Sequence, residues 1–350
     1  MEIEQHLWTL TPDGEAVVLY TFRNSSGASV SVTNLGAAIV AVKVPDRAGL
    51  LSDVALGYQD PLSYLSDSAT MGKSVGRVAN RIAEGRMTIE GQEYRLEVNS
   101  GRNHLHGGSK GFATRLWESR VETNRVVMEL FSEDGDQGYP GNLQVEVVFD
   151  FDEENTLDIT YRAITDQTTP INLTNHLYLN LNGESAGSIL DHELQLHCSQ
   201  ALEMNRDQIP TGALLAVKDT PLDFTTFHRL GDGIDAEFNH IRDCKGYDHP
   251  LVLDHWKPNI LTEVGLLRSP LSGRTVTIRT SQPSVMLYTG NWLAGGCPIT
   301  KSAARYDDYA GVAVECQNFP DAVNHPTFPS SLLHAGETYC QKISYQFGIY

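Results

Sequence analysis

The 350-residue sequence has few cysteines, few basic residues and no long apolar run. Its 26 Lys and Arg residues are outnumbered by 44 Asp and Glu residues, which gives a net charge of −18. Nucleic acids and anionic membrane surfaces are therefore poor partners, because phosphate binding relies on clustered basic side chains. The acidic composition fits a soluble protein that acts on a neutral small molecule.

The cysteine content argues against two kinds of cross-link. The five cysteines are odd in number and widely spaced, which excludes a disulfide framework and paired CxxC zinc sites: Cys198, Cys244, Cys297, Cys316 and Cys340. No run of about 18 apolar residues predicts a membrane span. The acidic start at Met1–His6 lacks the apolar core of a signal peptide. We expect a cytoplasmic protein that is a monomer or a homodimer.

Strand patterns recur along the chain. Short β-branched and aromatic runs are bounded by Gly, Asn, Asp and Pro: Val17–Phe22, Ser29–Val32, Arg125–Phe131, Leu143–Phe149, Thr156–Tyr161, Thr275–Arg279 and Ile343–Phe347. Only Asp60–Leu65 and the region after Asp223 suggest short helices. Regular strands without alternating helices predict an all-β fold, a large antiparallel β-sandwich. Without repeats or linkers, residues 1–350 are predicted to form one domain.

A glutamate interrupts an apolar strand pattern near the carboxyl terminus of the chain. The run Gly311–Val314 predicts a buried strand, and with a period of two Glu315 and Gln317 share the face opposite Val314. Pro320 cannot continue a strand ladder, so the chain is expected to turn outward here. Taken alone, Glu315 could simply be a paired carboxylate at a strand end.

The run from Ile171 to Leu181 alternates cleanly. Apart from Asn175, its odd positions carry apolar side chains, whereas uncharged polar groups occupy the even positions: Asn172, Thr174, His176, Tyr178 and Asn180. An ordinary solvent face carries more Lys and Glu. We therefore expect a strand that lines a wet cleft inside the fold, with His176 as either a catalytic or a structural residue.

Two further polar stretches precede this run. In Ser74–Ala83, Arg77 is expected to tie a loop to a carbonyl or carboxylate group. If Arg102–His106 is extended, Arg102, His104 and His106 share one face, and a metal site is then an alternative because His-x-His is a common ligand spacing.

Two later stretches add an acid and aromatic side chains. Asp248 follows Tyr247 in an expected loop, where its carboxylate either accepts from sugar hydroxyls or caps a turn. Tyr288 and Trp292 lie at a predicted strand end, where aromatic rings either stack on a sugar or pack in the core.

These stretches together resemble the aldose 1-epimerase (galactose mutarotase) family, nearly from end to end. The resemblance rests on an ordered series of motifs: GRVANRIAEG, NHLHGG, DQGYPGNL, TNHLYLNL, GYDHPL, YTGNW and VECQNFPDAVNHP. It implies a large antiparallel β-sandwich with a carbohydrate cleft. It also implies an isomerase that interconverts the anomers of free aldoses such as glucose and galactose, with no metal and no cofactor.

The resemblance also implies roles for six residues. Glu315 would be the base that takes the proton from O1, and His176 would be the acid that supplies a proton to O5. This mechanism requires His176 to be charged near neutral pH. The remaining four would hold the sugar: Asn80, Arg81, His106 and Asp248. The sequence departs from the family at Met286, where a glutamine is usual, and this puts the sugar preference in doubt.

Several alternatives remain open. A glycoside hydrolase could use Glu315 with Asp248 as its pair of acids. A silent carbohydrate-binding module would bind sugar without exchanging anomers. A metal enzyme would use His104, His106 and His176. A relative acting on hexose phosphates is less attractive, because it would need several basic residues around the cleft.

Overall fold

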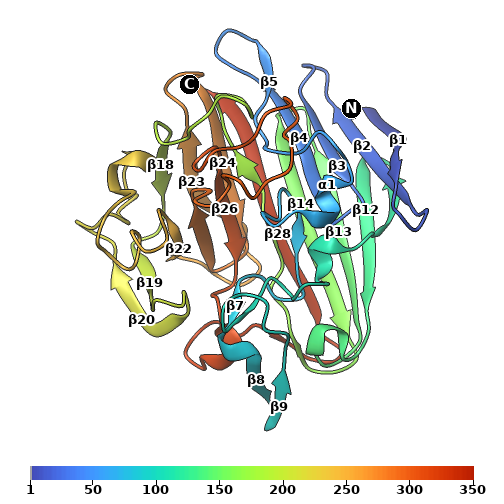
Figure 1. Cartoon of the computed structure of the whole chain (residues 1–350), viewed down its shortest axis with the longest axis vertical. Coiled ribbons are helices and arrows are strands. Elements are labelled where there is room, and N and C mark those ends of the chain that lie inside the picture. The colour runs from blue at the N-terminus through green and yellow to red at the C-terminus, as the bar shows by residue number, and fades with distance from the viewer. Residues whose placement is uncertain (1) are drawn as a thin grey trace.

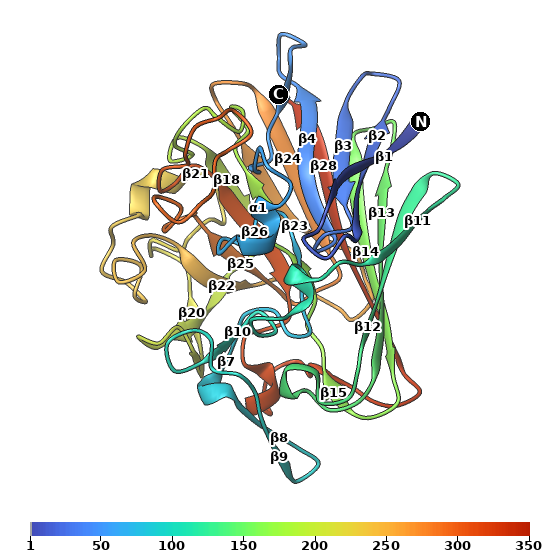
Figure 2. The same cartoon turned by 45° about the vertical axis from the view of Figure 1, so that its right-hand side comes forward.

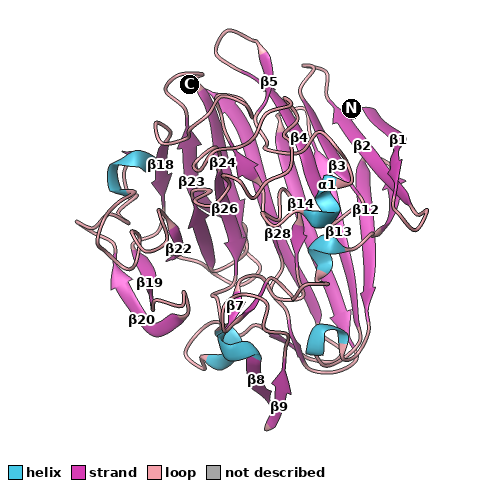
Figure 3. Ribbon diagram, viewed as in Figure 1, coloured by secondary structure: helices cyan, strands magenta, loops and turns pink. Residues whose placement is uncertain are grey.

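The computed structural model describes residues 2–350 and is built almost entirely of antiparallel strands (Figure 1, Figure 3). Its helical elements are one short α-helix and five 3₁₀ turns: α1 (Ser63–Ser66), η1 (Ala83–Gly85), η2 (Phe112–Thr114), η3 (Asp136–Gly138), η4 (Leu230–Gly233) and η5 (Ala322–Asn324). Within residues 2–350, no helix is long and apolar enough to span a bilayer.

The largest sheet joins strands from both halves of the chain. Its nine strands have the spatial order β11 (Glu118–Glu122), β12 (Arg125–Ser132), β13 (Leu143–Phe151), β14 (Thr156–Thr165), β28 (Thr338–Ile349), β24 (Arg274–Thr280), β23 (Thr262–Arg268), β18 (Glu193–Leu196) and β21 (His228–Arg229). The carboxyl-terminal strand β28 therefore lies in the middle of the sheet, between β14 and β24 (Figure 1).

Two smaller sheets and four strand pairs complete the fold. Five amino-terminal strands pair in chain order: β1 (Glu2–Leu10), β2 (Ala16–Arg23), β3 (Ser29–Thr33), β4 (Ala38–Pro45) and β5 (Leu51–Asp53). Six strands form the sheet β17 (Tyr178–Leu179), β26 (Val312–Gln317), β25 (Ser284–Tyr288), β22 (Asp248–Val252), β19 (Gln200–Met204) and β20 (Pro210–Ala216). The pairs are β7 (Arg81–Ile82) with β10 (His104–Leu105), β8 (Arg86–Ile89) with β9 (Gln92–Arg95), β15 (Thr169–Pro170) with β27 (Leu332–Leu333), and β6 (Ser74–Val75) with β16 (Thr174–Asn175).

One apolar core joins the three sheets. It contains Val30 from the five-stranded sheet, Val147 from the nine-stranded sheet and Leu287 from the six-stranded sheet, all fully buried. Figure 2 shows the amino-terminal strands β2–β4 beside β13 and β14. Because the inner face of each small sheet packs on the large one, the outer face of the six-stranded sheet is left to build a site.

The predicted all-β sandwich is confirmed. Each of the seven strand runs expected from alternation lies within a strand of the structure, and the run before Glu315 is β26. The helix expected near Asp60 is reduced to α1, and the region after Asp223 supplies only the 3₁₀ turn η4.

The single strand expected from Ile171 to Leu181 was wrong. This stretch is divided among β16, β17 and irregular segments, although its apolar side chains do enter the main core. Most of its polar side chains bind buried backbone instead of lining a cleft. Asn172 donates to the carbonyl oxygens of Ala79 and Asn318, and Thr174 donates to that of Cys316.

Candidate active site

A cleft of about 270 Å³ opens on the outer side of the six-stranded sheet. All six site residues named from the sequence line it: Asn80, Arg81, His106, His176, Asp248 and Glu315. They come from five separate stretches of the chain. The fold therefore brings these six side chains into one space, together with Tyr178, Tyr288 and Trp292.

Glu315 reaches the cleft because of its position in β26. Val312, Val314 and Cys316 point into the main core, so the residue between the last two faces the other way. Its side chain is buried; Oε1 lies 3.5 Å from Nε2 of His176, and Oε2 has no hydrogen-bond partner within residues 2–350. Burial raises the pKa of Glu315 well above its ordinary value, the Asp248 carboxylate adds to this, and Arg81 opposes it.

Two backbone hydrogen bonds fix the position of His176. Its N–H donates to the carbonyl oxygen of Lys73 at 2.9 Å, and its own carbonyl accepts from the N–H of Gly72 at 2.9 Å. Its ring stacks on that of Tyr178, with centroids 4.8 Å apart and planes 26° apart. Nδ1 has no partner within the described chain. The imidazole is therefore fixed in position while its nitrogens remain available.

Burial opposes the charge on His176 that the expected mechanism requires near neutral pH. Burial lowers the pKa of His176 to about 4, although the carboxylates of Asp67 and Asp248 partly oppose this. An acidic neighbourhood is present, as expected, but desolvation outweighs it. Glu315 and His176 are thus both shifted towards their neutral forms.

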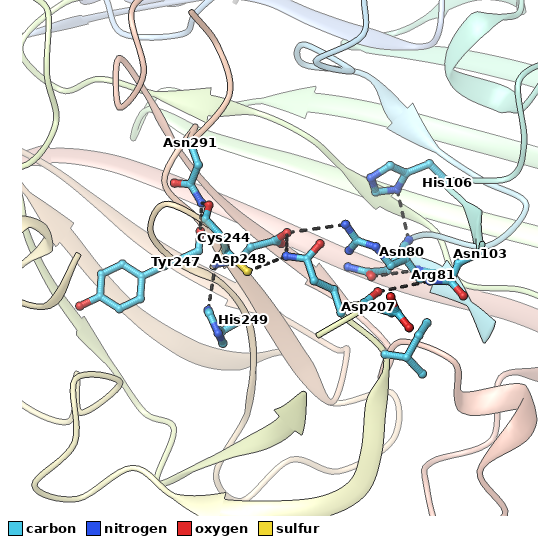
Figure 4. A network of polar contacts seen from close by, with 12 residues as sticks. Asn80, Arg81, Asn103, His106, Asp207, Cys244, Tyr247, Asp248, His249 and Asn291 are labelled. Atoms are coloured by element: carbon cyan, nitrogen blue, oxygen red, sulfur yellow. Dashed lines mark hydrogen bonds and ion pairs between the residues drawn. The ribbon is translucent and has the colours of Figure 1, made fainter. Parts of the chain in front are cut away.

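His106 presents a defined hydrogen-bond donor to the cleft. The backbone N–H of Asn80 donates to Nδ1 of His106 at 3.2 Å (Figure 4). Burial lowers the pKa of His106 well below its ordinary value, so the ring is neutral. A neutral ring that accepts at Nδ1 carries its hydrogen on Nε2. The next residue must be Gly107, because a Cβ there would lie 1.8 Å from the carbonyl oxygen of Gly76.

Arg81 and Asp248 form an ion pair in the lining of the cleft. Nη2 of Arg81 lies 3.8 Å from Oδ2 of Asp248, and both side chains are largely buried. Asp248 begins strand β22 and so is not in the expected loop. Gln208, which sequence reasoning missed, donates from Nε2 to the same Oδ2 at 2.7 Å. No local pattern marks Gln208, since its partner lies 40 residues further along the chain.

The shared face expected for Arg102, His104 and His106 was wrong. Strand β10 ends at Leu105, and His106 has a left-handed φ of 52°, which ends the alternation. His104 is buried elsewhere, with its ring nitrogens bonded to Glu97 O and Tyr139 Oη, whereas exposed Arg102 pairs with Glu84. Nowhere in residues 2–350 are three or more His, Cys, Asp or Glu side chains grouped so that they could hold a metal ion.

Arg77 has the structural role expected for it. Its guanidinium group is buried and binds the carbonyl oxygens of Ser132, Pro140 and Gly141, among others. The cleft therefore contains one arginine from this motif, Arg81, and not two.

The site offers an acid/base pair at the base of a small polar cleft. Glu315 and His176 each keep a buried atom without a partner, and Arg81, Asp248 and Nε2 of His106 supply charged and neutral hydrogen-bonding groups around them. Such a set suits a small ligand rich in hydroxyl groups, and it can take a proton from one ligand oxygen while giving one to another.

Comparisons with known proteins agree with this chemistry. The sequence matches the aldose 1-epimerase family over residues 18–346. It is 40% identical to the galactose mutarotase of Mus musculus over 340 residues, which cover 97% of this chain and 96% of the relative. It is 36% identical to the aldose 1-epimerase of Escherichia coli K12, over 97% of both chains. The crystal structure of an aldose epimerase homologue from C. elegans matches with a TM-score of 0.86 at 31% identity, covering 94% of this chain and 98% of the other.

Proposed function

The chain belongs to the aldose 1-epimerase family, and we propose that its cleft interconverts the α and β anomers of a free aldose through Glu315 and His176. Like its relatives it is an isomerase of the mutarotase type. The observation that carries the assignment of these two residues is the buried pair itself, 3.5 Å apart at the base of a cleft rich in hydroxyl-binding groups.

Anomer exchange needs two proton transfers to open the sugar ring and the two reverse transfers to close it. The carboxylate of Glu315 takes the proton from O1 while the imidazolium of His176 gives a proton to O5, and the ring opens to the aldehyde. Rotation about the C1–C2 bond and the reverse transfers close the ring with the other configuration. A positioned acid or base of this kind accelerates a reaction by about 10²–10⁴-fold.

The pair holds one proton in total. Burial favours two neutral groups, a protonated Glu315 beside a neutral His176. The working form differs only by transfer of that proton from Oε1 of Glu315 to Nε2 of His176, across 3.5 Å. Sugar hydroxyls that donate to the Glu315 carboxylate stabilise this form, because hydrogen bonds to the charged state favour it.

The remaining groups orient the sugar. We propose that Arg81 and His106 donate to sugar oxygens, that Asp248 accepts from sugar hydroxyls, and that Asn80 supports His106 and Arg81 through its backbone and side chain. Since Arg81 and Asp248 lie side by side, 3.8 Å apart, together they offer a donor and an acceptor to neighbouring sugar hydroxyls.

The wider description of the protein is also a proposal. Glucose and galactose are proposed as substrates, because the net charge of −18 favours a neutral sugar. A cytoplasmic location suits the five free cysteines, four of them buried. A monomer or homodimer without nucleic acid or membrane partners is proposed. One domain for residues 1–350 is supported by a main core that extends from Tyr20 to Phe347.

Polarimetry of freshly dissolved α-D-glucose and α-D-galactose tests the proposed pair. We expect the wild type to accelerate mutarotation and both Glu315→Gln and His176→Ala to lower kcat by about 10²–10⁴-fold, because each lacks one proton carrier. Glu118→Gln, at an exposed position on the edge strand β11, is the matched control and should keep wild-type activity. Near-normal turnover by folded Glu315→Gln would disprove the assignment.

The hydrolase alternative predicts a different product. It would use Asp248 as the second acid, but this carboxylate already accepts from Gln208 and faces Arg81. Release of free sugar from a glycoside, measured in the same preparation, would support it; we expect none.

A further inference from the structure

Two neighbouring side chains of strand β26 carry buried atoms that have no hydrogen-bond partner within residues 2–350. These atoms are Oε2 of Glu315 and both amide atoms of Gln317, Oε1 and Nε2. The two residues are 2% and 0% exposed, respectively. Alternate residues of a strand point to the same side, and their Cα atoms lie roughly 6.6 Å apart. The ends of a glutamate and a glutamine side chain can meet across that distance.

The strand around Gln317 is held on both sides. The carbonyl oxygen of Gln317 accepts from Oγ of Ser284 on β25 at 2.8 Å. On the other side, Oγ1 of Thr174 donates to the carbonyl oxygen of Cys316 at 2.7 Å. These bonds fix the backbone, so the amide of Gln317 stays on the face that carries Glu315. A buried amide is normally hydrogen-bonded, because leaving it without a partner destabilises the fold.

No other group within the described chain bonds to Oε2 of Glu315. His176 approaches the other carboxyl oxygen, Oε1, at 3.5 Å. Further charged or titratable groups interact with the carboxyl group electrostatically: Arg81, Tyr178, Asp248, Tyr288, Cys316 and Tyr345. Since none of these bonds to Oε2, the neighbouring amide is the group best placed to do so.

An amide also suits a carboxyl group that changes its protonation state. In the proposed reaction Glu315 takes up and returns a proton in each turnover. An ionised carboxylate only accepts hydrogen bonds, whereas a protonated carboxyl group also donates one. A glutamine amide offers a donor at Nε2 and an acceptor at Oε1, so it can bond to both states. The bond to the ionised state is the stronger one and therefore favours the working form.

We infer that Gln317 is a positioning residue for the base: its amide donates to Oε2 of the ionised Glu315 and accepts from the carboxyl group when that group is protonated. The inference rests on the proposed function, since it assigns Gln317 a role only through Glu315. Gln317 does not line the cleft, so it acts on the carboxyl group and not on the sugar.

Gln317→Met tests this role, because methionine keeps the unbranched shape and removes the amide. We expect kcat/KM for glucose, measured by polarimetry, to fall by about 3–30-fold, as for a lost hydrogen bond to a charged group. The basic limb of the kcat/KM profile should move to higher pH, since the ionised carboxylate loses a donor. The acidic limb should not move, because Glu315 keeps its proton there. Gln144→Met, at an exposed position of β13, is the matched control and should change neither limb nor plateau.

The outcomes separate this inference from the proposed function. Absence of mutarotation in the wild type would overturn the proposed function itself. An active wild type with an unmoved basic limb in folded Gln317→Met would overturn the inference alone, and a loss confined to KM would contradict it by indicating contact with the sugar. If Gln317→Met folds poorly, Gln317→Asn replaces it. Its amide is one methylene too short to reach Oε2, so its basic limb should move in the same direction, and an unmoved limb would again overturn the inference.

Discussion

Burial acts on Glu315 and His176 in the same sense, towards neutrality, and their separation of 3.5 Å lets one proton pass between them. The pKa of the carboxyl group is raised well above its ordinary value and that of the imidazole is lowered to about 4. Between these limits the pair keeps one proton. A pair with one proton contains one acid and one base, whichever residue carries the proton, and this is what reversible anomer exchange needs.

The pH dependence of kcat/KM follows from this sharing, because kcat/KM reports the acid and base of the free enzyme. Below a pH of about 4, His176 takes up a proton while Glu315 keeps its own, so the pair holds two protons and no base remains. Above the raised pKa of Glu315 the shared proton leaves and the acid is lost. We expect kcat/KM, corrected for spontaneous mutarotation, to stay flat across neutral pH and to fall at both ends. An acidic limb near 6.5, the ordinary value for histidine, would contradict this.

At the scale of elements, the segment from Asp67 to Lys73 holds the histidine in place. The Asp67 carboxylate accepts from the N–H groups of Ala69 and Met71 at 2.8 and 2.7 Å and lies 3.3 Å from the buried ammonium of Lys73. Tyr178, which stacks on His176, donates from its hydroxyl to Ala69 O at 3.0 Å. One carboxylate thus orders the loop on which the imidazole rests.

Substitution of Asp67 tests whether this segment positions and tunes His176. The Asp67 carboxylate raises the pKa of His176, so Asp67→Asn lowers it and moves the acidic limb of kcat/KM to lower pH. Looser placement of the imidazole should lower kcat by about tenfold or more. Asp60→Asn is the matched control, because exposed Asp60 caps the preceding turn through Leu62 N. A fall in kcat without movement of the limb would indicate a purely structural role.

The pairing of β25 with β26 places an apolar residue beside the proposed base. Met286 is the register partner of Glu315, is 1% exposed and does not line the cleft. The sequence had suggested that this residue affects sugar preference. Its position points instead to the carboxyl group, since a thioether offers no donor to Oε2 of Glu315.

We therefore expect Met286→Gln to change the pH dependence of activity. An amide donor to the carboxylate should lower the pKa of Glu315 and move the basic limb of kcat/KM to lower pH, and the ratio of glucose to galactose turnover should stay the same. Met286→Leu keeps the apolar character and volume and should leave the limb unchanged. A changed sugar ratio in Met286→Gln, with an unmoved limb, would show that this position contacts the substrate.

At the scale of the whole molecule, Arg77 fastens the loop before the cleft to the nine-stranded sheet. Its two terminal nitrogens make six hydrogen bonds, to backbone and hydroxyl oxygens between Ser132 and Thr169. Burial lowers the pKa of Arg77 to about 10, so the group remains charged at neutral pH. The cleft residues Asn80 and Arg81 follow directly and depend on this attachment.

Arg77→Met should strongly destabilise the fold. It leaves several buried oxygens without donors, and we expect the apparent free energy of unfolding in urea to fall by about 3–5 kcal/mol. The control is Arg125→Met, whose side chain is 60% exposed and pairs with Asp150 at 2.8 Å. An exposed pair of this kind contributes about 0–1 kcal/mol. Equal effects of the two substitutions would disprove the tethering role.

The sequence anticipated more of the strands than of their connections. Alternation located β2, β12, β13 and β28, because a half-buried strand repeats its environment every two residues. Alternation predicted the wrong side-chain directions where strands are only two residues long, as in β10 and β17. A turn after such a short strand changes the direction in which the following side chains point. His104 was misplaced for this reason.

The sequence by itself determined the all-β class, the outward direction of Glu315 from β26 and, through an ordered set of motifs, six residues of the cleft. Only the tertiary structure decided how those residues behave. Gln208, Asp67 and the rim at Trp292 join the site through contacts between distant segments, which no local pattern records. The tertiary structure also decided which residue of the acid/base pair carries the proton. Desolvation sets this preference, and it depends on everything packed around a group and not on the group's neighbours in the chain.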